Sequence, residues 1–474
     1  MKKYIVLLLV CGFAMSCNKD FDSLNTDIKN PKDVDPSFLF AGAQRQMSDV
    51  LTNSNVNFNI FRLVSQYWNE TTYIDESNYD LKRRNIPQNF WNQMYVDVIK
   101  ALVDCKEQIK RTDATLADPA NINRNAMADI MIVYAYSILV NTYGDVPYSE
   151  ALDINKVYPK YDDGATIYAD LLTRLDKDLA ALDDTSDGFG GGDLFMGGNV
   201  TKWKVFANSL KLRLGMTIAD SDPTLAKTVV EAAAPNVMQS SADNLVFHYL
   251  ASPPNTNPVW VDLVQSNRKD FIAAKTIIDI MAGVNDPRMP FYFTTDAAGG
   301  YSGATIGAKS NYSNFSKPNN SLLAQDADAI LMDYSEISFY LAEAVERGFI
   351  GGVAATYYEE GVRSSIINWG GTDAMATTYL QQADVAYATA PGDYKQKIGT
   401  QKWLALYNRG FEAWGEVRRL DWPKMTTPVK PKSGFPVRYT YPVQEQNLNT
   451  ANWTTASAAI GGDVVETKLF WDKF

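Results

Sequence analysis

The sequence predicts an all-α fold built from paired helices with long loops between them. Apolar residues recur every three or four positions over most of the chain, and the alternating patterns typical of strands are scarce. Polar, Gly- and Pro-rich stretches separate the helical patterns. A chain of 474 residues, of which 46% are hydrophobic and 21% charged, is long and apolar enough to bury a large core.

The amphipathic pattern is clearest between residues 167 and 182. Leu171, Leu175 and Leu179 repeat every four positions and share one helix face, while charged residues occupy the other. Only residues 245–250 and 438–443 favour short strands, and the second ends at Pro442. Similar apolar patterns predict helices over residues 36–51, 88–110, 125–143, 202–218, 336–348, 356–369 and 401–420.

These helices fall into pairs joined by polar linkers, which is the order expected of helix-turn-helix repeats. A fixed period of roughly 34 residues is not visible, so we expect degenerate tetratricopeptide-like repeats interrupted by insertions. Long non-periodic stretches inside such a body are usually functional. The pairs are 88–110 with 125–143, 167–182 with 202–218, and 356–369 with 401–420.

The first 35 residues read as a lipoprotein export signal and tether. Lys2 and Lys3 precede a short apolar stretch and then small residues up to Cys17, which is the order of a secretory signal over residues 1–16. The apolar stretch is shorter than the ~20 residues that span a bilayer. A cysteine after small Ser16 predicts acylation at Cys17, followed by a lipidated tether over residues 17–35; the alternative is simple secretion with a free thiol. Cys105 lies among apolar residues at helical spacing, which predicts a buried thiol.

Composition excludes several classes of function. Lys and Arg number 44 against 55 Asp and Glu, a net charge of −11, whereas nucleic-acid binding needs a basic surface. The single histidine, His248, leaves no imidazole cluster for a metal or a nucleophile pair. We therefore expect no metal, no cofactor and no nucleic-acid partner.

Four segments of the chain form distinctive motifs in a set order. Residues 141–152 read NTYGDVPYSEAL, residues 201–214 read TKWKVFANSLKLRL, and residues 285–290 read NDPRMP. The fourth segment combines QKWLALYNRGFEAWGEVRR at 401–419 with PVRYTYP at 436–442. Together these segments resemble the SusD/RagB family of nutrient-binding outer-membrane lipoproteins of Bacteroidetes. The resemblance implies one SusD-like helical-repeat domain over residues 36–474. It also implies a surface-exposed, lipid-anchored protein that passes an oligosaccharide to a TonB-dependent, SusC-like transporter.

We expect these motifs to hold the fold together instead of performing chemistry. Arg213, Arg418, Arg419 and Glu416 are charges on helix faces that would tie repeats together, and Gly144 would end a helix. The Gly-rich stretch 187–193 lacks the preceding strand and the ending of a phosphate loop, so it is interpreted as a flexible loop.

Aromatic residues in polar loops are the candidate ligand contacts, because Trp and Tyr rings match the apolar faces and hydroxyl rims of sugars. The resemblance places such loops early in the chain, at about 65–92, and in the insertion at 251–329. Two rival functions remain: binding of a peptide, and hydrolysis of a glycan by paired carboxylates such as Asp75 and Glu76. The candidates are Trp68, Tyr73, Tyr79, Tyr292, Tyr301, Tyr312 and Phe315, although Trp68 in particular could equally belong to the core.

Overall fold

The computed structural model describes residues 34–112 and 118–474. The signal at 1–16, the acylation site Cys17 and nearly all of the tether therefore lie outside the described residues. Within the described residues, eight α-helices precede the insertion: α3 (Pro36–Thr52), α4 (Phe61–Val64), α5 (Ile86–Asn92), α6 (Lys100–Thr112), α7 (Pro119–Tyr143), α8 (Gly164–Ala181), α9 (Val200–Thr217) and α10 (Pro223–Ala233).

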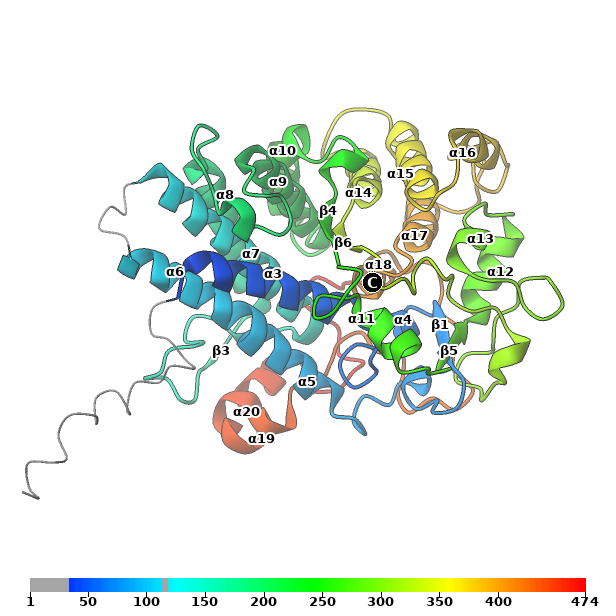
Figure 1. The fold of residues 1–474 in the computed structure, drawn as a ribbon, viewed down its shortest axis with the longest axis horizontal. Helices are drawn as coiled ribbons and strands as arrows, with labels where there is room; N and C mark the ends of the chain where they lie inside the picture. Colours follow the sequence, from blue (N-terminus) through cyan, green and yellow to red (C-terminus); the bar gives the residue numbers. More distant parts are fainter. Residues whose placement is uncertain (1–33, 113–117) are drawn as a thin grey trace, which may run out of the picture.

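Helices α11 to α13 belong to the insertion, and the remaining helices complete the body (Figure 1). The prediction of an all-α fold is confirmed, because strands are few and short. The later helices are α11 (Pro258–Trp260), α12 (Lys275–Gly283), α13 (Met289–Tyr292), α14 (Tyr334–Glu346), α15 (Ala354–Asn368), α16 (Asp373–Leu380), α17 (Tyr394–Ala405), α18 (Gly410–Leu420), α19 (Val443–Leu448) and α20 (Thr450–Ala459).

Helix packing includes each of the predicted pairs. Helix α6 packs against α7, α8 against both α7 and α9, and α15 against α14 and α17. The predicted helix 88–110 is a continuous helix, in which a π-helical stretch at Gln93–Ile99 joins α5 to α6. A large cluster of buried apolar side chains extends from Phe40 to Val465, and a second, smaller cluster between α14 and α18 includes Phe339, Val362 and Leu420.

Helix α7 is the central core helix. Among the described helices it alone is long and apolar enough to cross a membrane, but 94% of its most apolar window is buried inside the protein. Its apolar surface is therefore used by the core. The helix ends at Gly144, whose φ of 89° favours glycine, as predicted from the sequence.

One predicted helix, 401–420, is divided in two. Residues 406–409 separate α17 from α18, and Asn408 adopts a left-handed conformation with φ of 72°. Helix α18 begins at Gly410, where a Cβ atom would lie only 2.5 Å from the backbone nitrogen of Arg62. Close approach of α4 therefore forces the break, and glycine permits it.

Three two-stranded antiparallel sheets connect loops to the body: β1 (Trp68–Glu70) with β5 (Phe271–Ala273), β2 (Val146–Pro147) with β3 (Tyr161–Asp162), and β4 (Leu245–Phe247) with β6 (Ala329–Met332). Strand β4 confirms part of the prediction at 245–250. The strand predicted at 438–443 is absent, because its backbone nitrogens bond to different segments: Arg438 to the Val465 carbonyl and Tyr439 to the Thr142 carbonyl.

Buried ion pairs join helices that are far apart in the sequence. Arg213 of α9 bonds to Glu336 of α14 with Nε–Oε1 of 2.7 Å, and Arg419 of α18 bonds to Glu343 of α14 with Nη1–Oε1 of 2.6 Å. Arg418 donates to the carbonyl of Asn141 at the end of α7. The prediction that these motif residues tie the repeats together is confirmed.

The Gly-rich stretch is fixed in place by one carboxylate, contrary to the prediction of a flexible loop. Asp193 is 3% exposed. Its Oδ2 accepts hydrogen bonds from the indole of Trp203 (2.7 Å) and the backbone of Gly198 (2.9 Å), and its Oδ1 accepts one from Gln44. The glycines let the backbone fold tightly around this acceptor.

Candidate ligand-binding site

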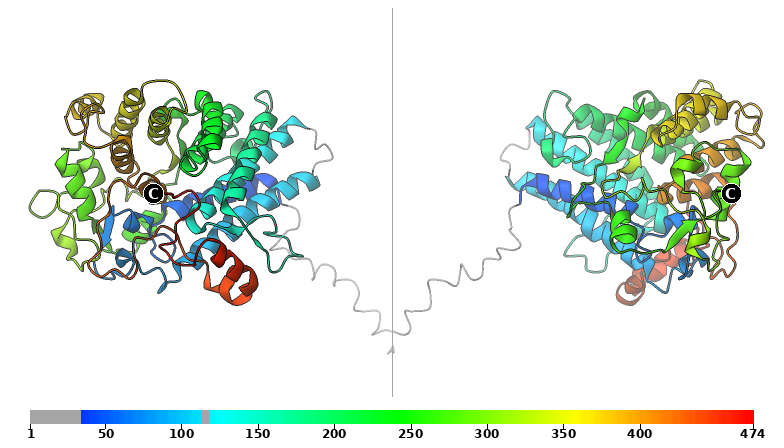
Figure 2. Two further views of the ribbon diagram at one scale, coloured as in Figure 1. Left: turned by 180° about the vertical axis from the view of Figure 1, so that it is seen from behind. Right: turned by 45° about the vertical axis from the view of Figure 1, so that its right-hand side comes forward.

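The two predicted ligand-binding loops lie together in the structure. Strand β1, from the early loop, pairs with β5, from the insertion, with Trp68 opposite Ala273. Thr71 continues this contact, since its backbone nitrogen donates to the carbonyl of Asp270 and its carbonyl accepts from Ser310. Both loops lie at the same end of the helical body (Figures 1 and 2).

Four of the predicted aromatic side chains reach the surface here. Tyr73 is 68% exposed and Tyr301 is 36% exposed, while Tyr312 and Phe315 are half-buried. The Nζ of Lys317 lies 5.3 Å from the Tyr312 ring centroid. We call Tyr73, Tyr301, Tyr312 and Phe315 the aromatic loop surface.

Backbone hydrogen bonds hold the insertion half of this surface. Ser302, next to Tyr301, accepts at its carbonyl from the Ser316 nitrogen (3.0 Å), and its own nitrogen donates to the Ser316 hydroxyl (3.1 Å). Ser316 is buried and its carbonyl accepts from Ala273 of β5. The backbone beside Tyr301 and Phe315 is thus held by hydrogen bonds, which lowers the entropic cost of ordering this part of the surface when a ligand binds.

The other three candidates are buried, unlike the four of the aromatic loop surface. Trp68 is 1% exposed, and its indole donates to the Tyr407 hydroxyl at 3.0 Å. Tyr292 is fully buried and stacks on Tyr407 with ring centroids 4.2 Å apart. Tyr79 is 4% exposed and bonds to Gln66. Large aromatic rings with one polar atom suit a core as well as a ligand, so residue type alone did not separate the two roles.

A carboxyl pair lies beneath the loop that carries Tyr73. Glu70 is 3% exposed, and its Oε2 accepts from the Ser77 nitrogen at 2.8 Å. The carboxyl of Glu76 is also buried, and its Oε2 has no hydrogen-bond partner in the described structure. Glu76 is paired in turn with Arg84. Burial, together with the negative charge of Glu76, raises the pKa of Glu70 to about 9.

We predict that this raised pKa makes the protein less stable as pH rises. The unfolded chain loses the Glu70 proton near its ordinary pKa of 4.5, whereas the folded protein keeps it up to about pH 9. Protonated Glu70 therefore makes its full contribution to the free energy of unfolding below pH 4.5. This contribution is lost progressively as the pH rises to 9. Glu70→Gln keeps the hydrogen bonds without the titration, and is expected to gain at least about 1 kcal/mol over the wild type between neutral and alkaline pH. Denaturation measured from pH 5 to 9 tests this, with exposed Glu107→Gln as the control; equal pH dependence in Glu70→Gln and wild type would contradict it.

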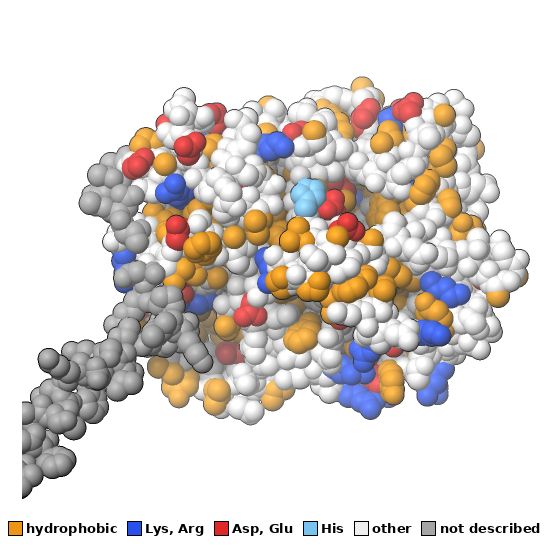
Figure 3. Space-filling model, in the orientation of Figure 1, with side chains coloured by type: hydrophobic (Ala, Val, Ile, Leu, Met, Phe, Trp, Pro, Cys, Tyr) orange, Lys and Arg blue, Asp and Glu red, His pale blue; other side chains and the backbone are white. Residues whose placement is uncertain are grey.

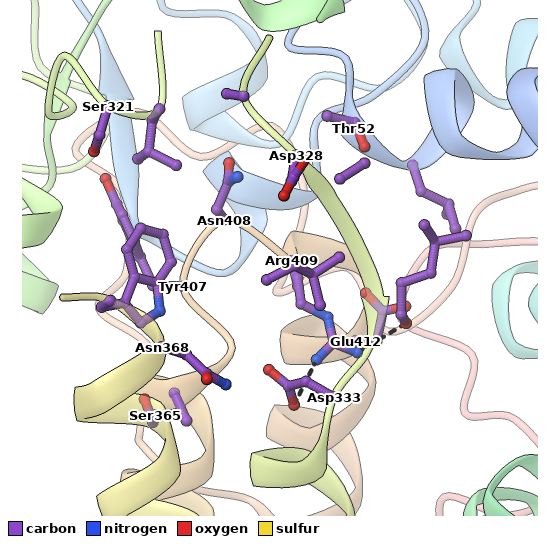
Figure 4. A pocket seen from close by; sticks show the side chains of 18 of the residues that line it. Thr52, Ser321, Asp328, Asp333, Ser365, Asn368, Tyr407, Asn408, Arg409 and Glu412 are labelled. Carbon is purple, nitrogen blue, oxygen red and sulfur yellow. Dashed lines mark hydrogen bonds and ion pairs between the residues drawn. The ribbon is translucent and has the colours of Figure 1, made fainter. Parts of the chain in front are cut away.

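The structure also contains a cavity of about 330 Å³ that the sequence did not indicate (Figure 4). It lies between the segment that leads into β6, the start of α14, the end of α15 and the link between α17 and α18. In Figure 4, Tyr407 and Asn368 lie on one side of the opening and Asp328 and Arg409 on the other. Because the lining comes from segments far apart in the sequence, no local motif signals it.

Charged side chains form the base of this cavity. Arg409 lies 3.1 Å from Asp333 (Nη1–Oδ1) and is also paired with Glu336. Burial raises the pKa of Asp333 and of Glu412 above their ordinary values. These side chains are almost fully shielded from bulk water, and Arg409 compensates part of the negative charge of Asp333 and Glu336.

The mouth of the cavity is exposed. Asp328 is a lining residue, and its Oδ1 lies 2.7 Å from Nδ1 of His248. Figure 3 shows the histidine on this face beside acidic side chains. Over residues 34–112 and 118–474 no group of three or more His, Cys, Asp or Glu side chains is arranged to hold a metal ion.

Comparisons with known proteins agree on one family. A family model named SusD-like, described as starch-binding and associating with the outer membrane, matches residues 28–442. A search of curated proteins finds no match. Among solved structures, a chitin-binding protein is 27% identical, with a TM-score of 0.81 over 93% of this chain and 100% of its own.

Two further structures extend this agreement. A chitin-binding SusD homolog from Flavobacterium johnsoniae is 25% identical, with a TM-score of 0.78 over 92% of this chain and 98% of its own. A SusD homolog from Bacteroides uniformis is 26% identical, also with a TM-score of 0.78, over 92% of this chain and 100% of its own.

Proposed function

The chain belongs to the SusD-like family, and from this premise we propose that it captures an oligosaccharide at the cell surface and delivers it to a SusC-like, TonB-dependent transporter. In this proposal the signal at 1–16 is removed, Cys17 is acylated and residues 36–474 form one helical-repeat domain. Family membership supports a nutrient-binding role associated with the outer membrane. The choice of a glycan draws support from the starch-binding description of the family and from two chitin-binding relatives.

The observation that supports the proposal is the pairing of β1 with β5, which brings the two predicted loops together. Tyr73 and Tyr301 are exposed, although large aromatic side chains are otherwise mostly buried in this chain. Flat rings beside amide and hydroxyl groups offer stacking to sugar faces and hydrogen bonds to their hydroxyls. Capture and delivery of a glycan require binding but no cleavage of the ligand, so we propose that the protein is not an enzyme.

Removing one exposed ring is expected to weaken glycan binding without unfolding the protein. Tyr301→Ala should reduce the affinity for chitohexaose or maltohexaose, whichever the wild type binds, by about 1–3 kcal/mol, because it deletes one stacking face. Isothermal titration calorimetry measures this change. Tyr158→Ala is the matched control, since Tyr158 is 63% exposed but lies between β2 and β3.

Three outcomes would contradict parts of this proposal. Unchanged affinity in Tyr301→Ala would exclude the aromatic loop surface as the site. Release of reducing sugar by the wild type would favour the glycoside hydrolase. Binding of peptides, with no binding of either hexasaccharide, would favour the peptide-binding alternative within the family.

A further inference from the structure

We propose that the cavity between β6 and the α17–α18 link is a second carbohydrate site, which binds the end of a glycan chain. The inference rests on the proposed glycan-binding function and adds to it a preference for chain ends. The cavity is distinct from the aromatic loop surface, because none of the four aromatic residues of that surface lines it.

One wall of the cavity is an indole ring held by other aromatic rings. Trp369, at the end of α15, is half-buried and lines the cavity. Tyr292 packs against it with centroids 4.7 Å apart at 67°, and Tyr407 lies at 5.5 Å. Its indole nitrogen has no hydrogen-bond partner among the residues described. The ring therefore offers a fixed apolar face and one spare donor to a ligand.

Other polar groups around the cavity also have hydrogen-bonding capacity to spare. Asn368 is exposed, and its side-chain amide bonds to no other part of the chain as described. The Oδ1 of Asn408 accepts from Arg62 (2.9 Å), which leaves the amide N–H groups of Asn408 available. Glu412 receives only a 3.4 Å contact from the Tyr134 hydroxyl and an ion pair at 3.9 Å with Arg213.

Arg409 adds a deeply buried donor to this group. Its residue surface is 7% exposed, and its Nε has no hydrogen-bond partner in the described structure. A buried polar group that lacks a partner destabilises the protein, so a ligand acceptor that pairs with it gains binding energy. Sugar hydroxyls both donate and accept, so a sugar ring fits a site that mixes spare amide and indole donors with carboxylate acceptors.

The size of the cavity selects the length of the ligand. Small-molecule sites span about 300–1,000 Å³, and this cavity lies at the lower end of that range at about 330 Å³. Exposed Ser321, Asp328 and Asn368 mark its mouth, while Asp333 and Arg409 close its base. A closed base admits only the end of a chain, about one or two rings, and excludes internal segments of a polymer.

Calorimetric titration with disaccharides tests the inference. The probes are chitobiose and maltose, each compared with its hexasaccharide, on the wild type and on Asn368→Ala, Trp369→Ala and Tyr301→Ala. We expect one of the two disaccharides to bind the wild type within about tenfold of its hexasaccharide. Asn368→Ala should weaken that binding roughly tenfold, since it removes hydrogen bonds to the ligand without removing any bond within the described protein.

The other variants distinguish loss of a ligand contact from loss of folding. Trp369→Ala is expected to weaken the disaccharide more strongly, but Trp369 packs on Tyr292, so Asn368→Ala decides the question if Trp369→Ala unfolds. Tyr301→Ala should leave disaccharide binding unchanged. Exposed Asn236→Ala, in the segment after α10, is the matched control for Asn368→Ala and should also have no effect.

The outcomes separate this inference from the proposed function. If a hexasaccharide binds and neither disaccharide does, the chain-end site is wrong and the glycan-binding function stands. Disaccharide binding that is unchanged in Asn368→Ala and Trp369→Ala, or lost in Tyr301→Ala, would likewise overturn it. If none of the four sugars binds, both the inference and the proposed function fail.

Discussion

Replacing Arg288 with leucine is expected to destabilise the protein by about 3–5 kcal/mol. The side chains of Arg288 and Asp286 are both fully buried, and they lie 2.6 Å apart (Nη2–Oδ2). Arg288 also donates to Ser365 (3.0 Å) and Gln401 (2.9 Å). Arg288→Leu would leave the Asp286 carboxylate in the core without its counter-charge, which costs far more than losing an exposed ion pair.

Denaturation curves followed by circular dichroism measure this effect. Lys275→Leu is the control, because Lys275 forms an ion pair with Asp279 in which both side chains are 56% exposed, and it should change stability by less than about 0.5 kcal/mol. Combining Arg288→Leu with Asp286→Leu should recover part of the loss by removing the orphaned charge as well. Equal stability of Arg288→Leu and wild type would show that this motif does not hold the fold.

Replacing Cys17 with alanine is expected to abolish attachment to the outer membrane. Acyl chains contribute ~0.8 kcal/mol per buried CH₂, and stable anchoring needs more than one chain, so losing the acylated cysteine removes the anchor entirely. Fractionation and palmitate labelling of intact cells measure the change. Cys105→Ala is the control and should retain both, because Cys105 is fully buried and burial raises the pKa of its thiol to about 12.

Cys17→Ala protein that still fractionates with the outer membrane and still labels with palmitate would contradict acylation at this residue. Release of the variant in folded form would support it. The described domain begins at α3 and does not include Cys17, so its fold should not depend on the substitution.

Helical periodicity predicted the helices well where each helix packs along its whole length. Helix α8 has an unbroken stripe of leucines and lies within three residues of its predicted ends. The stretch 401–420 is equally apolar, but a contact with α4 interrupts it at Gly410. That contact joins segments more than 300 residues apart, so no local pattern reveals it. The same limit applies to Asp193, whose bond to Gln44 converts a Gly-rich stretch into a fixed loop.

The sequence predicted which loops carry the candidate site, but not which of their aromatic residues are exposed. Polar surroundings identified Tyr73 and Tyr301, which are exposed. Trp68 and Tyr292 occur in similar sequence surroundings but are buried, because both pack around Tyr407, which lies more than 100 residues away in the sequence. The cavity beside Trp369 arises entirely from such long-range packing.

Purification of the tagged, full-length protein from native outer membrane in mild detergent tests most directly whether the protein acts with a transporter. A stable complex of this kind should bury more than about 2,000 Å² of surface and survive mild detergent. We predict recovery of a large TonB-dependent barrel in a near-stoichiometric amount. Recovery of the protein as a monomer without such a barrel would contradict the claim and favour a free-standing surface binder.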